Sequence, residues 1–164
     1  MTIFIKNKHT LQIEDFKFRC CIGKNGLTKK KREGDKKTPI GLFKIENLYF
    51  RKDRKDKPKT LLKCVEIKKN MGWCNDVHFP NKYNKLIKIQ KKIKYEQLRR
   101  RDYKYDLLIP IKYNFDKTTA GLGSCIFIHL TKNYQPTAGC VGLKEKDFLI
   151  MLKLIQKKTR IKIY

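Results

Sequence analysis

The chain has 164 residues and 40% hydrophobic content, which suits one domain with a buried core and is too short for two comfortable ones. Its 41 Lys and Arg against 15 Asp and Glu give a formal net charge of +26, which suggests a polyanionic partner but equally fits a solvated, lysine-rich surface. No apolar stretch is long enough to span a membrane, and the N-terminus lacks the apolar core and cleavage site of a signal peptide. We therefore expect a single domain over residues 1–164 with no visible export signal.

Short strands are predicted along the first part of the chain. Two apolar runs at 2–5 and 11–13, with a polar turn between them, predict a hairpin, and the alternating run at 16–22 predicts a third strand. Further apolar runs predict strands at 42–49 and 61–67. Short strands separated by turn residues favour a β-dominated fold.

The second part of the chain mixes strands with helical patterns. Apolar residues set among charges predict one short helix at 93–101. The run at 107–111 is apolar but contains Pro110, which predicts an edge strand or a bulge. Apolar residues at helical spacing predict a helix over 145–158, and the alternating run at 160–164 predicts a closing strand. The whole pattern predicts a mainly β (α+β) domain with one or two helices.

Two segments before residue 85 offer candidate binding residues. The basic loop at 29–41 contains Arg32, whose planar donor fork suits a carboxylate-bearing substrate, and the hydroxyl of Thr38. The same loop fits a solvated surface turn without a binding role. The segment 71–84 mixes aromatic residues with Asn, Asp and His, so Trp73 suits either the wall of a cleft or a position in the core.

The segment 124–143 carries the clearest chemistry. An apolar run ends in His129, and a polar loop leads from there to Gly139 and Cys140. A cysteine is a good nucleophile as a thiolate, so a nearby imidazole that takes its proton would activate it. The glycine before the cysteine would let backbone N–H groups approach a developing oxyanion. The pattern predicts that Cys140 and His129 meet as nucleophile and base.

The other cysteines indicate neither a metal site nor a disulfide framework. None of the six cysteines is spaced Cys-x-x-Cys, and no Cys and His set falls at zinc-finger spacing. Cys20, Cys21, Cys64 and Cys125 lie in apolar runs and resemble small buried hydrophobic residues. We predict free thiols, no metal and no cofactor, and this usage of cysteine fits a reducing compartment.

Four blocks of sequence stand out: 31–43 (KREGDKKTPIGLF), 71–76 (MGWCND), 121–129 (GLGSCIFIH) and 136–143 (PTAGCVGL). Together and in this order they resemble the YkuD-type L,D-transpeptidase catalytic domain. The similarity covers nearly the whole chain. It implies a β-sandwich-like or barrel-like fold in which the His-bearing strand and the Cys-bearing loop form the site.

The resemblance also implies a reaction on peptidoglycan stem peptides or muropeptides. Cys140 would attack the carbonyl of an L,D peptide bond, release D-alanine and form a thioester, which an amine of a neighbouring stem would resolve to a 3→3 cross-link. His129 would act as base and acid, with its ring oriented by the backbone carbonyl of Leu130. The backbone amides from Ala138 to Cys140, including that of Gly139, are candidates for the oxyanion hole. The candidates for substrate binding are Arg32, Thr38, Trp73, Thr137 and Ala138.

The chain departs from the family pattern at two positions. Many members have His directly before Gly-Cys and Arg two residues after the Cys, whereas this chain has Ala138 and Gly142. The first departure leaves His129 as the only candidate base. The second leaves open how the carboxylate of the substrate is held, with Arg32 or a lysine as the replacement. The short separation between His129 and Cys140 indicates a divergent subgroup.

Alternatives from other classes stay open beside the L,D-transpeptidase. If water resolves the thioester, the same site is an L,D-carboxypeptidase. A non-catalytic basic module could bind an anionic polymer or nucleic acid, with nucleic acid disfavoured, and a redox thiol protein is disfavoured by the missing Cys-x-x-Cys. The family implies the periplasm or cell wall, the absence of a signal leaves the cytoplasm open, and the oligomeric state is left open.

Overall fold

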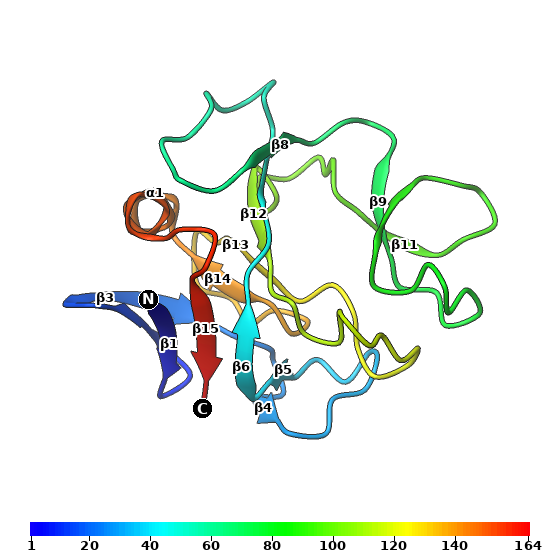
Figure 1. Ribbon diagram of the computed structural model, residues 1–164, viewed down its shortest axis with the longest axis horizontal. Helices are drawn as coiled ribbons and strands as arrows, with labels where there is room; N and C mark the ends of the chain where they lie inside the picture. Colours follow the sequence, from blue (N-terminus) through cyan, green and yellow to red (C-terminus); the bar gives the residue numbers. More distant parts are fainter.

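A computed structural model describes residues 1–164 and shows a large curled sheet with one helix beside it (Figure 1). The main sheet has ten strands, which pair in the order β6 (Gly41–Lys44), β15 (Arg160–Ile163), β1 (Thr2–Lys6), β2 (Thr10–Ile13), β3 (Phe16–Cys21), β14 (Val141–Leu143), β13 (Phe127–Leu130), β12 (Leu107–Pro110), β7 (Leu48–Phe50) and β8 (Cys64–Glu66). A three-stranded sheet and a two-stranded sheet accompany it: β10 (Leu86–Lys88), β9 (Met71–Cys74) and β11 (Tyr95–Gln97), and β4 (Leu27–Thr28) with β5 (Thr38–Pro39). The helix α1 spans Glu145–Leu154. The predicted mainly β class is confirmed.

The main sheet curls until strands from its two halves come close. Ile45, which follows β6, forms a β-bridge with Ile111, which follows β12. Beside this bridge the Lys112 amide donates a hydrogen bond of 2.8 Å to the Lys44 carbonyl. These contacts tie the edge strand β6 to the region of β12 and give the sheet its barrel-like curl.

Two hydrophobic clusters pack against the central pair β13 and β14. Side chains alternate between the two faces of a strand, so neighbours in sequence join different clusters. The larger cluster contains residues of β13, β14 and the helix α1, among them Ile128, Leu130, Val141, Leu143, Phe148, Met151 and Leu152. The smaller cluster is formed by Tyr49, Ile67, Trp73, Leu98, Tyr105, Leu108, Phe127 and Cys140. The smaller cluster therefore underlies the face of the sheet that carries the cysteine singled out by the sequence.

Several predicted elements match the structure closely. The hairpin β1–β2, the third strand and the closing strand lie where the hydrophobic alternation placed them. The predicted helix is present but ends at Leu154, because Ile155 adopts an extended conformation (φ −81°, ψ 155°). The segment 42–49 is divided into β6 and β7, since the chain leaves the first strand where Ile45 bridges to Ile111.

The prediction of a helix at 93–101 is wrong. Its central part is β11, which pairs with β9, and the Tyr95 ring packs so closely on Gly72 that a Cβ there would lie 2.8 Å from the ring. Long-range pairing overrides the local helical pattern. The edge position predicted for 107–111 is also wrong, because β12 pairs with both β13 and β7. Pro110 is its last residue and lies beyond the two residues that pair with β7.

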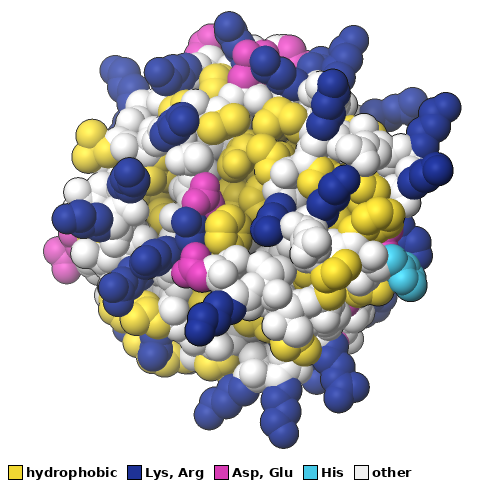
Figure 2. All heavy atoms as spheres, turned by 45° about the vertical axis from the view of Figure 1, so that its right-hand side comes forward, with side chains coloured by type: hydrophobic (Ala, Val, Ile, Leu, Met, Phe, Trp, Pro, Cys, Tyr) yellow, Lys and Arg dark blue, Asp and Glu magenta, His cyan; other side chains and the backbone are white.

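Positive side chains project from the face of the molecule that Figure 2 draws. Figure 2 shows Lys and Arg side chains projecting around one face, with hydrophobic side chains grouped between them. The helix α1 is too short to cross a membrane, and no other helix is present.

Candidate active site

Strands β13 and β14 place His129 and Cys140 on the same face of the main sheet. The two strands run parallel, with Ile128 opposite Val141 and His129 opposite Gly142. Cys140 directly precedes β14 and is two positions from Gly142, so its side chain shares the face of Gly142 and His129. Both side chains line one polar cavity of about 490 Å³. The structure thus brings together the two residues that the sequence paired.

Cys140 is held as a neutral thiol. Its side chain is buried, and its Sγ donates a hydrogen bond of 3.1 Å to the Cys125 carbonyl and accepts one of 3.4 Å from the Phe127 amide. Burial raises the pKa of the Cys140 thiol to about 12; the Phe127 amide acts in the opposite direction, and the negative charge of Glu96 adds to the rise. No hydrogen bond joins Cys140 to His129 in this conformation.

His129 is held as a neutral imidazole with one nitrogen committed. Its Nδ1 lies 2.9 Å from the carbonyl oxygen of Leu130, which fixes the proton on Nδ1 and leaves Nε2 as the acceptor. Burial lowers the pKa of His129 to about 4; the bond to Leu130 opposes this, and the positive charges of Lys104 and Arg100 lower the pKa further. The imidazole is therefore unprotonated at neutral pH and able to accept a proton.

Tyr105 packs against the histidine ring. The two rings meet edge to face with centroids 5.4 Å apart, and Tyr105 makes a similar contact of 5.8 Å with Phe127. Its hydroxyl donates a hydrogen bond of 3.0 Å to Glu96, and the Arg100 guanidinium lies 5.0 Å from its ring centroid. The Tyr105 ring therefore restricts the movement of the imidazole.

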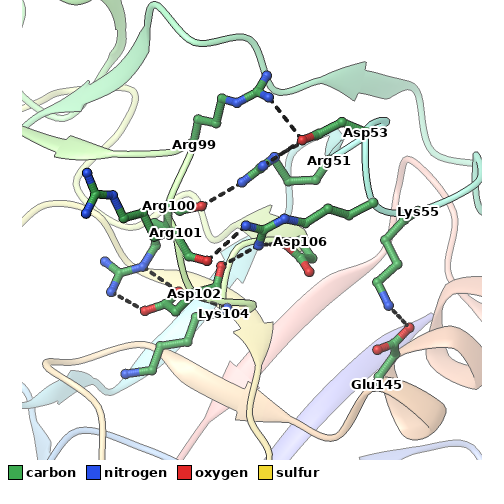
Figure 3. Close-up of polar contacts among 11 residues, drawn as sticks. Arg51, Asp53, Lys55, Arg99, Arg100, Arg101, Asp102, Lys104, Asp106 and Glu145 are labelled. Carbon is green, nitrogen blue, oxygen red and sulfur yellow. Dashed lines mark hydrogen bonds and ion pairs between the residues drawn. The ribbon is translucent and has the colours of Figure 1, made fainter.

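A network of ion pairs holds this wall of the cavity in place (Figure 3). Arg100 binds Asp102 at 2.7 Å and Glu96 at 3.1 Å. A neighbouring group joins the 51–55 loop to the 99–106 segment: Arg51 and Arg99 both bind Asp53, and Arg54 binds Asp106. Arg51 also donates a 2.7 Å hydrogen bond to the Arg100 carbonyl. The wall that carries Tyr105 is thus fixed by paired charges between segments far apart in sequence.

The loop that carries Cys140 is anchored by two threonines. Thr38 is fully buried, donates to the Gly139 carbonyl at 2.8 Å and accepts from the Gly23 amide at 2.9 Å. Thr137 donates to the Cys140 carbonyl at 2.7 Å and accepts from the Gly139 amide at 3.0 Å. Gly139 has φ 141°, and a Cβ there would lie 2.9 Å from the Lys37 carbonyl, so only glycine suits this close approach.

The candidate binding residues fall into two groups. Thr137 and Ala138 line the cavity with Cys140. Arg32, Thr38 and Trp73 are not among the cavity residues. Arg32 is exposed, Thr38 lies beneath the cysteine loop, and Trp73 is only 2% exposed, with its Nε1 donating to Asn84 at 3.0 Å. Of the two positions that the sequence left open for Trp73, the structure shows the core position.

A side chain at position 142 is excluded by its neighbour in the sheet. Gly142 pairs with Cys21, and a Cβ on Gly142 would lie 2.6 Å from the Cys21 sulfur and 3.3 Å from Thr131. Cys21 is itself buried, so it has little room to move aside. The absence of an arginine after Cys140 is therefore built into the packing of β3 against β14.

Sequence reasoning missed several residues of the cavity. Glu96 and Arg100 come from the segment for which a helix was predicted, and Lys104 and Tyr105 follow that segment. The Cys125 carbonyl comes from a residue taken as a buried hydrophobic. No local pattern marks them. The only available signal was the family block that ends at His129, which contains Cys125.

A buried thiol and an imidazole that share a polar cavity are the components that cysteine-dependent acyl transfer requires. The whole chain places this pair within one family: residues 1–163 match the model of the L,D-transpeptidase catalytic domain, YkuD. The protein belongs to this family, as the sequence blocks predicted.

Solved structures share the fold. The helical cell shape determining protein Pgp2 from Campylobacter jejuni matches with a TM-score of 0.56 and 17% identity, over 99% of this chain and 46% of that chain. A point mutant of Pgp2 matches with the same TM-score of 0.56 and the same coverage. The chain spans less than half the length of this protein, and the similarity shows the fold alone. Comparison with curated proteins gives no match.

Proposed function

We propose that residues 1–164 form one catalytic domain that transfers acyl groups of peptidoglycan stem peptides through Cys140. The observation that carries this proposal is that Cys140 and His129 line the same cavity, while the Nδ1 of His129 is committed to the Leu130 carbonyl. Membership of the L,D-transpeptidase family supports stem peptides as the substrates. The name of Pgp2 as a cell shape determining protein fits a role for this chain in shaping the wall.

The first step begins with a change at the thiol. The Sγ–H that now points to the Cys125 carbonyl turns toward Nε2 of His129 when a substrate enters. His129 takes the proton, Cys140 Sγ forms a bond to the carbonyl carbon, and a tetrahedral oxyanion results. The carbon–nitrogen bond to D-alanine then breaks, and the proton passes from His129 to the departing amine. The product is a thioester on Cys140.

Backbone amides of the cysteine loop are available to the oxyanion. The Gly139 amide donates to Thr137 Oγ1, whereas the amides of Ala138 and Cys140 donate to no acceptor within the protein. We assign these two N–H groups as the first candidates for the oxyanion hole. Gly139, which lies between them, lets the chain approach the Lys37 carbonyl closely.

The second step decides the outcome. His129 accepts a proton from the incoming nucleophile, the nucleophile bonds to the thioester carbonyl, and the thiolate of Cys140 leaves and is reprotonated. An amine of a second stem peptide gives a 3→3 cross-link, and water gives a shortened stem, as an L,D-carboxypeptidase would. Both outcomes share the acylation of Cys140.

Incubation with a tetrapeptide-stem muropeptide, followed by mass spectrometry of protein and products, tests the proposal. We expect loss of D-alanine, an acyl adduct on Cys140, and either a dimer or a tripeptide stem. Cys140→Ala should abolish the adduct and His129→Ala should lower turnover strongly. Cys64→Ala is the matched control, because Cys64 lies outside the cavity. Turnover that survives both active-site substitutions would refute the proposal.

A further inference from the structure

The cationic side chains that line the cavity differ in whether they have an ion-pair partner. Lys36, Arg100 and Lys104 line it together with the carboxylates Glu33 and Glu96. Arg100 is neutralised by Asp102 and Glu96, whereas the ammonium groups of Lys36 and Lys104 form no ion pair or hydrogen bond within the protein. A cation without a partner at a substrate cavity is available to an anionic group of the substrate.

The main chain of Lys104 is fixed next to His129. Its carbonyl accepts a 3.0 Å hydrogen bond from the Leu130 amide, and its amide donates one of 3.1 Å to Asp102. Figure 3 shows its side chain extending away from the ion-pair network, with no partner at the ammonium. The backbone of this lysine is therefore fixed, while its ammonium group has no partner within the protein.

The charge of Lys104 affects the pKa values of two residues on either side of Gly142 in the sheet. It lowers the pKa of His129, secondary to burial, and it opposes the rise that burial causes in the pKa of Cys21. Cys21, Gly142 and His129 occupy paired positions on β3, β14 and β13. The charge of Lys104 thus acts on both residues that pair with Gly142.

The chemistry of the leaving group places a carboxylate near this lysine. His129 returns its proton to the nitrogen of the departing amino acid, so that nitrogen must lie against the imidazole. In a terminal amino acid the carboxylate is separated from this nitrogen by a single carbon atom. A free carboxylate therefore lies on the His129 side of the cavity, within reach of a lysine whose main chain is bonded to Leu130.

We propose that Lys104 binds the terminal carboxylate of the amino acid that Cys140 releases, and that it restricts the site to stem peptides with a free carboxyl end. Lys104 is thus a specificity-determining residue that takes over from a side chain that position 142 cannot carry. This inference rests on the proposed function for the identity of the substrate. A carboxylate on the side chain of the stem's diamino acid is the competing source of the same chemistry.

Three matched peptides separate the sources of the carboxylate. They are a tetrapeptide stem, the same stem with its terminal carboxyl amidated, and the same stem with the diamino acid's carboxyl amidated. Each is tested for turnover by the parent, Lys104→Met, Lys104→Arg and the control Lys88→Met, whose lysine lies outside the cavity. Binding of each peptide to Cys140→Ala, with and without Lys104→Met, is measured by calorimetry so that recognition is observed without catalysis.

We expect Lys104→Met to lower kcat/KM on the free tetrapeptide about 10- to 100-fold, mainly through KM, and to leave the terminally amidated peptide nearly unchanged. Lys104→Arg should recover most of the loss, and Lys88→Met, on β10 outside the cavity, should stay within about threefold of the parent. Equal losses on the free and terminally amidated peptides would overturn the assignment. If Lys104→Met loses no activity on the peptide amidated at the diamino acid but does lose activity on the other two, Lys104 binds the carboxylate of the diamino acid. That result would also overturn the assignment.

The binding arm separates this inference from the proposed function. If the parent releases no D-alanine but Cys140→Ala binds the free acid more tightly than the amide in a Lys104-dependent manner, the catalytic proposal fails and the carboxylate site stands. If the parent turns over the peptide but free acid and amide bind and react alike, the catalytic proposal stands and the carboxylate site fails.

Discussion

The thiol of Cys140 donates its hydrogen bond to the carbonyl of Cys125 at 3.1 Å and not to His129, although both side chains line one cavity. A carbonyl acceptor favours the protonated thiol. The free protein therefore holds a neutral thiol beside a neutral imidazole, and the reactive ion pair is not formed before substrate binds. This resting state sets the pH behaviour and the reactivity of the site.

Cys140 should react slowly with alkylating agents in the absence of substrate. With a pKa of about 12, its thiolate fraction near neutral pH is on the order of a thousandfold below that of free cysteine, and burial slows it further. We expect iodoacetamide labelling of Cys140 to be negligible at pH 7.5 and to rise about tenfold per pH unit above it. Peptide mapping by mass spectrometry measures this. Rapid labelling at pH 7.5 would contradict the neutral resting thiol.

The stability of the protein should fall in acid because of His129. Its folded pKa of about 4 lies below the ordinary value of 6.5, so below pH 6.5 the unfolded chain binds the proton more readily. The contribution is fully present above pH 6.5 and is lost as the pH falls toward 4, by about 3 kcal/mol in total. Lys104, Arg100 and Asp102 are the charged groups that act on His129.

Urea unfolding at a series of pH values checks this, with His129→Gln as the comparison. The difference in unfolding free energy between the parent and His129→Gln should shrink from pH 7 to pH 4. Carboxylates that titrate in the same range affect both proteins and cancel in the difference. A difference that stays constant with pH would show that His129 is not held neutral by the fold.

Gly142 and Cys21 should be coupled in stability. Gly142→Ala places a methyl group 2.6 Å from the Cys21 sulfur, which forces a shift in a packed sheet and should cost about 1–3 kcal/mol. Removing the sulfur with Cys21→Ala should recover much of that cost, so the double variant is less destabilised than the sum of the single ones. Thermal or urea unfolding of the four proteins measures the coupling, and strict additivity would argue against the predicted clash.

Thr38 should support catalysis by holding the Cys140 loop in position, without contacting the substrate. Thr38→Val leaves the Gly139 carbonyl and the Gly23 amide without their buried partner, at a cost on the order of 2–4 kcal/mol. We also expect kcat to fall more than KM changes, because the Cys140 loop loses its position while the cavity wall remains. Thr38→Ser keeps the hydroxyl and should remain close to the parent. A selective rise in KM in Thr38→Val would instead support direct substrate binding.

The sequence was sufficient for elements whose hydrophobic pattern agrees with the final packing. Ile3, Ile5, Leu11 and Ile13 alternate in the sequence and are fully buried in β1 and β2. The pattern failed around Tyr95, where pairing with β9 and close packing on Gly72 decide the structure. Such contacts join residues far apart in the chain and leave no local periodicity.

For the site, the sequence paired His129 with Cys140 because a short loop links them. The residues that set their protonation are out of reach of that reasoning. Tyr105 and Lys104 approach His129 only after β12 pairs with β13, and the Cys125 carbonyl becomes an acceptor through a backbone at φ 55° that no motif indicates. The empty position at 142 was visible in the sequence, but its cause, the sulfur of Cys21, required the structure.

The register between β13 and β14 has the same importance for chemistry as the identity of the two residues. With Ile128 opposite Val141, the imidazole and the thiol lie on the same face of the sheet. A slip of a single position would turn His129 into the hydrophobic cluster beneath α1 and leave Cys140 alone at the cavity. Insertions or deletions in the loop between the two strands are therefore tolerable only where they preserve this alignment, so loop length can vary while strand alignment cannot.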